Sequence, residues 1–187
     1  MKLSAMFLTV ICMAAMANKT NAQAPEGFVQ GSVTLSNGSV ITGYVKEAIK
    51  KNAAISFADA KGNKQQYDGS QINGAMVDTV NYLCIRGDFF KIICTGKICF
   101  LQKASNASGK ASFNGTEAVF ASGTEGKIGD YFAYSNNQLT HLTKKTVNSF
   151  ITGQLSTNVA AVEKAKAANR DIALLAEAVT VYNNSNK

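Results

Sequence analysis

Residues 31–45 have the sequence GSVTLSNGSVITGYV, and this stretch predicts the kind of fold that the chain adopts. Apolar and polar residues alternate on either side of Asn37-Gly38, a dipeptide typical of two-residue hairpin turns because both turn positions need positive φ. Alternation with a period of two places one set of side chains on each face of a strand. We therefore expect an antiparallel hairpin of two strands, over 32–35 and 40–45.

Short apolar runs separated by turn residues continue along the chain. Segments 54–57 and 64–67 flank Lys61-Gly62-Asn63 and predict a second hairpin, and residues 72–77 predict a fifth strand. The polar residues 47–52 are interpreted as a loop or a single helical turn.

Residues 79–103 contain further apolar runs and predict a three-stranded meander joined at Arg86-Gly87-Asp88 and Gly96-Lys97. The tripeptide Arg-Gly-Asp binds integrins in some extracellular ligands, but glycine between charged residues is also ordinary turn chemistry, and we favour the turn. Residues 104–129 are rich in Ala, Ser, Asn, Gly and Lys and predict a long flexible loop or hairpin. One more hairpin is expected over 130–143.

The last part of the chain predicts helices. Apolar residues first recur at i, i+3, i+4 and i+8 from Val147 onwards. An Ala-rich helix follows, for which Ser156 or Thr157 is the expected N-cap. A final amphipathic helix is expected to end near Tyr182, with Asp171 in its first turn.

These elements place the chain in the α+β class, as a mainly antiparallel β body with two or three C-terminal helices packed on it. The body is expected to be either a small barrel or a meander of short hairpins. The chain is expected to divide into a signal peptide (1–22), a β-rich body (23–143) and C-terminal helices (144–187). Within the body, we expect barrel-like hairpins (28–77), the meander (79–103), the flexible loop (104–129) and a hairpin (130–143).

The first 22 residues predict export. Lys2 gives a positive start, residues 3–17 carry no charge, and Thr20-Asn21-Ala22 places small residues where signal peptidase reads the chain. The apolar run is shorter than the ~20 residues that a spanning helix needs. We expect cleavage after Ala22, no membrane span afterwards, and a final location in the periplasm, at the outer membrane or outside the cell.

Charge argues against a nucleic-acid partner. The chain has 19 Lys and Arg against 12 Asp and Glu, a net charge of +7, and loss of Lys2 and Lys19 would leave 17 − 12 = +5. The lysines are scattered, and Arg86 and Arg170 are the only arginines. Nucleic-acid binders usually carry a basic stripe with arginines, so scattered charge is better explained by solubility.

Several segments together carry a resemblance to a known family. They are Gly31-x-Val33-x-Leu35-x-Asn37-Gly38-x-x-Ile41-x-Gly43-x-Val45, the run FFKIICTGKICFL at 89–101, Asp130-Tyr131-Phe132 and the terminal Val179-Thr180-Val181-Tyr182-Asn183. In this order they resemble a family of uncharacterised exported proteins of Gram-negative bacteria. The resemblance implies export and a β-rich body with terminal helices, and it implies no reaction.

The sequence shows no familiar catalytic motif. It has no Gly-x-Ser-x-Gly, no Gly-x-x-x-x-Gly-Lys-Ser/Thr and no Cys-x-x-Cys. His141 is the only histidine, and we expect an exposed strand residue rather than a zinc ligand. The leading hypothesis is a non-enzymatic binding module without a cofactor. The alternatives are a hydrolase whose site forms only in three dimensions and a structural subunit of a surface assembly.

The cysteines of the processed chain have two interpretations. A two-residue turn at Gly96-Lys97 would place Cys94 opposite Cys99 with Cα atoms ~4.5 Å apart, which suits a disulfide. Export to an oxidising compartment favours such a bridge, with Cys84 left free. The alternative is that all three are buried free thiols.

Five further residues are candidates for contact or modification. Four tyrosines expected to be exposed could contact an envelope protein or a glycan, although strand packing is the simpler explanation: Tyr44, Tyr67, Tyr131 and Tyr134. Asp78-Thr79-Val80 resembles the acceptor sequence that some Gram-negative bacteria O-glycosylate, which makes Thr79 the candidate acceptor.

Overall fold

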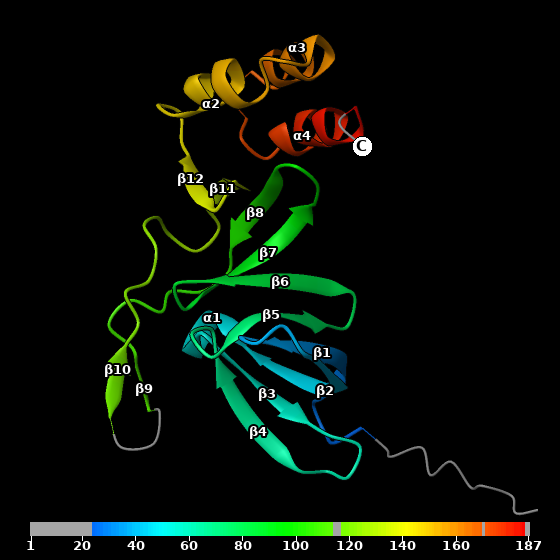
Figure 1. Ribbon diagram of the computed structural model, residues 1–187, viewed down its shortest axis with the longest axis vertical. Coiled ribbons are helices and arrows are strands. Elements are labelled where there is room, and N and C mark those ends of the chain that lie inside the picture. The colour runs from blue at the N-terminus through cyan, green and yellow to red at the C-terminus, as the bar shows by residue number, and fades with distance from the viewer. Residues whose placement is uncertain (1–23, 114–116, 170, 186–187) are drawn as a thin grey trace, which may run out of the picture.

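The protein folds around one large antiparallel sheet. The structure, a computed structural model, describes residues 24–113, 117–169 and 171–185. Ten strands follow one another in the order β12-β11-β8-β7-β6-β5-β1-β2-β3-β4, and β9 and β10 form a separate pair. The helices formed by residues 147–184 lie at one end of the elongated molecule (Figure 1). The fold is α+β, as predicted. Because β4 and β12 are free edges, the sheet is open, and the meander describes it better than the small barrel.

The first five strands form the half of the sheet far from the C-terminal helices. Their bounds are β1 (Val29–Leu35), β2 (Val40–Ala48), β3 (Ala54–Ala58), β4 (Lys64–Asp68) and β5 (Ile72–Val77), with the helical turn α1 (Ile49–Asn52) between β2 and β3. β1 lies between β2 and β5. This half curls around a buried core that includes Val33, Val45, Ile55, Phe57 and Ile72.

The turn between β1 and β2 differs in detail from the expectation. Leu35 N donates to Ser39 O (2.9 Å), so residues 36–38 form a three-residue connection. Gly38 has a φ of 85°, whereas Asn37 does not share the positive φ that a two-residue turn would require. The hairpin predicted from Asn37-Gly38 is therefore present, but its turn is one residue longer.

The second half of the sheet carries the helices. Its strands are β6 (Val80–Ile85), β7 (Asp88–Cys94), β8 (Cys99–Lys103), β11 (Tyr131–Ser135) and β12 (Gln138–Leu142). β8 pairs directly with β11, so the chain leaves the sheet after Lys103 and returns near Tyr131. This excursion contains the hairpin of β9 (Ala111–Phe113) and β10 (Ala118–Phe120), which projects sideways from the sheet (Figure 1).

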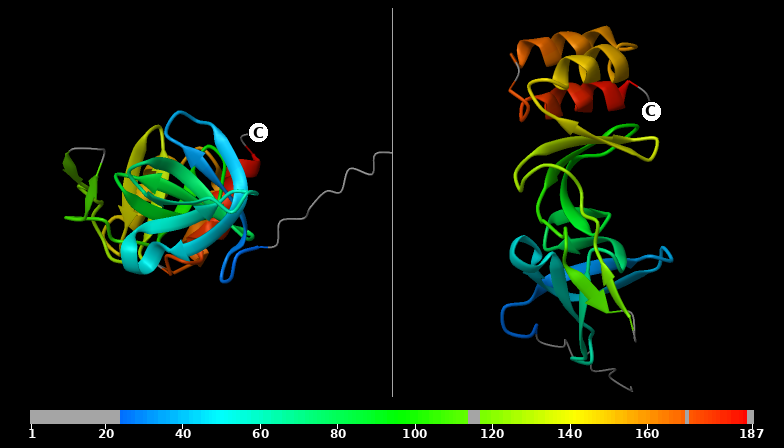
Figure 2. Two further views of the ribbon diagram at one scale, coloured as in Figure 1. Left: turned by 90° about the horizontal axis from the view of Figure 1, so that it is seen from below. Right: turned by 90° about the vertical axis from the view of Figure 1, so that its left-hand side faces the viewer.

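The helices α2 (Val147–Gln154), α3 (Val159–Ala167) and α4 (Leu175–Asn184) form a layer over this half (Figure 2). Phe100 and Leu142 from the sheet share a buried cluster with Phe150, Leu155 and Val179 from the helical region. Burial of this cluster is the hydrophobic contribution that holds the helices to the strands.

Two expectations about the helix ends are wrong. Asn158, rather than Ser156 or Thr157, caps α3, since its Oδ1 accepts a hydrogen bond from Ala161 N (2.9 Å). Asp171 lies ahead of α4 and not in its first turn, and its Oδ1 accepts from Ala173 N (3.0 Å) in the turn that leads into the helix.

Candidate functional site

The tyrosines proposed as contact residues do not form one surface. Tyr67 is buried and meets Phe57 edge-on at 6.4 Å, so its predicted exposure is wrong. Tyr131 is half-buried and stacks on Phe100 at 5.5 Å, and the Tyr134 hydroxyl donates to Asn137 Oδ1 (3.2 Å). Tyr44 is half-buried on β2, far along the strand order from β11.

Cys84, Cys94 and Cys99 are free and half-buried in the structure. The ladder between β7 and β8 slips between Ile92 and Cys94, so Cys94 faces Phe100 and not Cys99. The register on which the Cys94–Cys99 disulfide was predicted is therefore wrong. Burial raises the pKa of the Cys84 thiol and, to a smaller extent, that of Cys94.

The candidate O-glycosylation residue Thr79 is exposed, in the turn between β5 and β6. The Arg86-Gly87-Asp88 tripeptide forms a tight turn in which Arg86 and Gly87 have φ angles of 52° and 88°. Asp88 is fully buried, so this tripeptide cannot present a carboxylate to a partner.

Asp88 instead forms a buried ion pair with Lys103. Asp88 Oδ2 lies 3.1 Å from Lys103 Nζ, and both side chains have 0% exposure. Asp88 Oδ1 accepts from Ala107 N (2.7 Å), and Oδ2 accepts from both the backbone N–H and the hydroxyl of Thr124 (2.7 Å each). Charged groups survive burial only when they are paired and hydrogen-bonded in this way.

Lys103 fixes the returning part of the excursion. Its ammonium donates to the carbonyl oxygens of Thr124 (2.7 Å), Glu125 (3.1 Å) and Gly126 (3.3 Å). Because Asp88 holds residues at both ends of the 104–129 segment, the β9–β10 hairpin rises from an anchored base. The flexible-loop prediction missed this anchoring.

His141 is half-buried and carries a contact that the sequence does not reveal. Its Nε2 lies 3.1 Å from Asp130 Oδ2, and its ring stacks on Phe132 at 4.6 Å. Asp130 Oδ2 also accepts from Lys127 N (2.7 Å). The prediction of a simple exposed strand residue is therefore wrong, and His141 helps to hold the end of the excursion.

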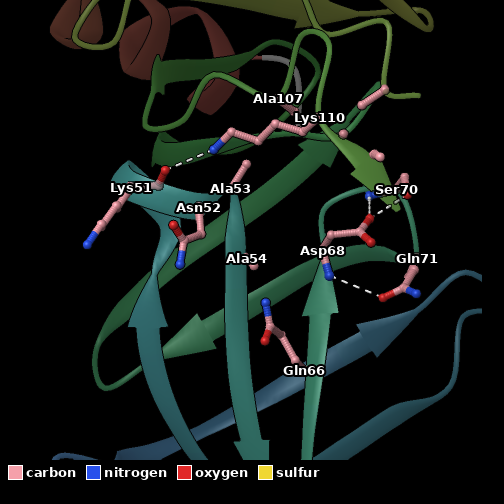
Figure 3. A pocket seen from close by; sticks show the side chains of 13 residues that line it. Lys51, Asn52, Ala53, Ala54, Gln66, Asp68, Ser70, Gln71, Ala107 and Lys110 are labelled. Atoms are coloured by element: carbon pink, nitrogen blue, oxygen red, sulfur yellow. Dashed lines mark hydrogen bonds between the residues drawn. The ribbon is translucent and has the colours of Figure 1, made fainter. Parts of the chain in front are cut away.

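The anchored excursion closes one side of a pocket of about 520 Å³ with a mixed polar and apolar lining, which we call the hairpin pocket. Its other walls are α1 and the adjoining ends of β3 and β4 (Figure 3). The residues that line it are Lys51, Asn52, Ala53, Ala54, Gln66, Asp68, Ser70, Gln71, Gly87, Ala107, Lys110, Ala111 and Ala121. Its volume lies within the ~300–1,000 Å³ range of small-molecule sites.

The lining of the hairpin pocket consists of small residues and of polar residues. Alanines and Gly87 leave space, whereas amides, a carboxylate and two lysines line the rest. Asn52, Gln66 and Asp68 project around Ala54 (Figure 3). Gly87 adopts the left-handed conformation, and a Cβ there would lie 3.0 Å from Ala121 Cβ, so glycine lets the hairpin approach this closely.

Hydrogen bonds order the polar rim of the hairpin pocket. Asp68 Oδ1 accepts from Ser70 N (2.8 Å) and from the Ser70 hydroxyl, while Asp68 N donates to Gln71 Oε1 (3.1 Å). On the opposite side, Lys110 Nζ donates to Lys51 O (2.9 Å), which ties the excursion to α1. The side chains that face the ligand space are therefore partly preorganised.

The hairpin pocket contains none of the residues that the sequence singled out as contact sites. Lys51, Asn52, Gln66 and Asp68 belong to polar segments that resemble ordinary loops and strand ends in the sequence. The sequence signal for the anchored excursion was Lys103, because it alternates in phase with the apolar Cys99 and Leu101, and a lysine on such a face needs an acidic partner. His141, Asp130 and the cysteines also lie outside this lining.

Residues 24–113, 117–169 and 171–185 contain neither a metal-binding cluster nor a candidate membrane-spanning helix. No group of three His, Cys, Asp or Glu residues there is placed to hold a metal ion. No helix in that part of the chain is long and apolar enough to cross a membrane. Comparisons with family models, curated proteins and solved structures found no match to the chain.

Proposed function

We propose that the protein is an exported, non-enzymatic binding module and that the hairpin pocket binds a polyhydroxylated ligand, such as a sugar unit of a glycan. The observation that carries this proposal is the mixed donor and acceptor lining of the hairpin pocket. A sugar hydroxyl both donates and accepts hydrogen bonds, so it needs both kinds of partner.

The side chains of the hairpin pocket offer these partners in a small space. Asn52, Gln66 and Gln71 each carry an amide with an acceptor oxygen and two N–H donors, and Asp68 adds acceptor oxygens. Lys110 adds an ammonium group on the hairpin side. An apolar ligand would shield these groups from water without replacing the hydrogen bonds that water makes to them, and it would lose affinity for that reason.

The lining also favours binding over acid–base chemistry. No histidine or cysteine belongs to it, and its carboxylate, Asp68, already accepts two hydrogen bonds from Ser70. A side chain that acts as a general base must lie within hydrogen-bond distance of the proton that it removes, and its pKa is usually shifted toward the working pH.

The test of binding is a calorimetric titration of the processed chain with a panel of neutral and acidic oligosaccharides. Gln66→Ala and Asp68→Ala are each expected to weaken binding roughly three- to tenfold, since a lost hydrogen bond is worth about 0.5–1.5 kcal/mol. Asn81→Ala is the matched control, because Asn81 is exposed on β6 and outside the hairpin pocket. Absence of saccharide binding, or equal weakening by Asn81→Ala, contradicts the proposal.

Export has a separate test. N-terminal sequencing of the protein from an extracytoplasmic fraction is expected to begin at Gln23. Full-length protein with an intact Met1 in the cytosol would contradict export without affecting the chemistry of the hairpin pocket.

A further inference from the structure

The hairpin pocket reaches the outer face of β3, where Ala54 lines it. Ile55 and Phe57 face the core, so the alternating residues Ala54, Ser56 and Ala58 lie on the opposite face. Ser56 is half-buried there, whereas Ala54 and Ala58 are buried (2% and 0% exposed). We call the strip of this face between Ala54, in the lining of the hairpin pocket, and Ser56, in the lining of a second pocket, the β3 trough. Its two residue steps of strand span about 7 Å, and a pocket at each end makes this face better suited to a chain of linked units than to one ring.

Longer side chains border the β3 trough on both sides. On β2, Lys46 lies directly opposite Ser56, and Tyr44 lies opposite Ala58. On β4, Gln66 and Lys64 lie opposite the same two residues of β3. The pairing therefore places one lysine on each side of the β3 trough.

A second pocket lies at the far part of the β3 trough, with a volume of about 450 Å³. It is lined by Phe28, Lys46, Ser56, Lys64, Gln65 and Gln66. Gln66 borders both pockets, so they are neighbours along the same face. The Lys64 ammonium lies 5.4 Å from the centre of the Phe28 ring, which holds it over this second pocket.

The charge along this face is positive. Lys46 and Lys64 line the second pocket and Lys51 and Lys110 line the hairpin pocket, whereas Asp68 is the one acidic residue in either lining. Within the part of the chain that the structure describes, none of these four lysines forms an ion pair. The charges of Lys46, Lys64 and Lys110 are available to a ligand, whereas the Lys51 ammonium points away from the hairpin pocket (Figure 3).

From this arrangement we propose, building on the proposed function, that the ligand is an oligosaccharide bearing carboxylate groups. One sugar unit occupies the hairpin pocket through its hydroxyls, the chain follows the β3 trough, and a carboxylate of a later unit lies between Lys46 and Lys64. Charge complementarity makes an anionic glycan a better occupant than a neutral one.

The position of the β3 trough distinguishes a glycan from an acidic peptide. Peptides that recognise sheets usually add a strand at a free edge, where the backbone supplies the hydrogen bonds. The β3 trough lies on the face of the sheet, between β2 and β4, where side chains supply all the contacts. A chain with hydroxyl groups on every unit matches such contacts better.

The experiment titrates the processed chain with three probes of similar length: oligogalacturonate, neutral malto-oligosaccharide and oligoglutamate. Oligogalacturonate is expected to bind most tightly, and its affinity is expected to fall as salt rises from low to physiological ionic strength. Equal binding of the neutral probe contradicts the charge preference but leaves the proposed function intact. Tighter binding of oligoglutamate contradicts the glycan assignment. Absence of binding by both saccharides contradicts the proposed function and the inference with it.

The variant pair Lys46→Gln/Lys64→Gln tests the placement. It is expected to weaken oligogalacturonate binding about tenfold and malto-oligosaccharide binding hardly at all, because each exposed charge contact contributes modestly. Lys144→Gln/Lys145→Gln removes the same charge from exposed positions before α2 and serves as the matched control. Equal effects of the two pairs would show that net charge, rather than the β3 trough, attracts the ligand, and would overturn the inference.

Discussion

Asp88 and Lys103 lie on the neighbouring strands β7 and β8 and form an ion pair of 3.1 Å that solvent does not reach. Together they bond to backbone groups on both arms of the excursion between β8 and β11. The wall of the hairpin pocket therefore depends on a charge pair outside its lining.

Replacing Asp88 with alanine is expected to destabilise the fold strongly. Lys103 would lose its counter-ion while remaining buried, and breaking a buried pair in this way costs about 3–5 kcal/mol. Urea unfolding of the purified variant measures the free energy of unfolding.

Lys164→Ala is the control for that variant. Lys164 and Glu177 lie 2.7 Å apart, but their side chains are 49% and 59% exposed, so the expected loss is at most about 1 kcal/mol. An equal loss of unfolding free energy in both variants would show that the buried Asp88–Lys103 pair stabilises the fold no more than an exposed pair does.

Asn183→Ala is expected to loosen the attachment of α4 to the sheet. Asn183 is buried, accepts from Ile98 N (3.0 Å) and donates to Ile98 O (2.8 Å) and Thr95 O (3.2 Å). Leaving these backbone groups unpaired costs about 1–3 kcal/mol, which thermal or urea unfolding measures. The exposed neighbour Asn184 provides the control, and Asn184→Ala should change stability by less than about 0.5 kcal/mol.

The thiols are expected to react slowly in the folded protein. Burial raises the pKa of Cys84 and Cys94, so a smaller fraction is thiolate at a given pH, and the thiolate is the reactive form. At pH 8, iodoacetamide should modify Cys84 at least about tenfold more slowly in the folded than in the urea-unfolded chain, since one pKa unit changes the thiolate fraction tenfold.

Mass spectrometry also tests the redox state of the same thiols. Without reductant, the unfolded, processed chain should take up one alkyl group for each of Cys84, Cys94 and Cys99. Uptake of a single group would show that Cys94 and Cys99 are bridged after all.

The turn between β3 and β4 is expected to lose stability in acid. Hydrogen bonding from the Asn63 side chain (2.7 Å) lowers the pKa of Asp59, with smaller contributions from the N–H groups of Asn63 and Lys61. A lowered pKa stabilises the fold above the unfolded value of about 3.9, and this contribution disappears as pH falls through the folded value. NMR titration of the Asp59 carboxyl carbon measures the folded pKa.

Two substitutions separate the causes of the Asp59 shift. Asn63→Ala should move the midpoint back toward the ordinary value, because it removes the largest contribution. Lys61→Ala should move it much less, since the Lys61 charge is the weakest contributor and its N–H remains. The reverse order would contradict the assignment.

Local signals predicted most of the sheet. The runs 54–57, 64–67 and 72–77 correspond closely to β3, β4 and β5, because alternation and turn residues act over a few positions. The cap of α3 was misassigned because Asn158, Ser156 and Thr157 are all competent caps, and only the observed start of the helix selects Asn158.

Features that depend on distant residues were not predictable in the same way. The bulge before Cys94 places Phe100, and not Cys99, opposite Cys94, and nothing in the sequence of this hairpin indicates the change of register. The hairpin pocket joins residues of α1 and β4 to others more than forty positions later, such as Lys110. That juxtaposition follows from the Asp88–Lys103 pair, whose partners come together only when β7 and β8 align.

The segment between β8 and β11 leaves the sheet and returns to it at nearly the same point, so it could be exchanged by engineering or during evolution. Gly129 N donates to Lys103 O and Lys103 N donates to Asp130 O, each at 2.8 Å, so the points of departure and return are one hydrogen bond apart. The segment between them behaves as an accessory inserted into an otherwise continuous hairpin. Exchanging it, together with the charges buried at its root, would give the same scaffold a different specificity.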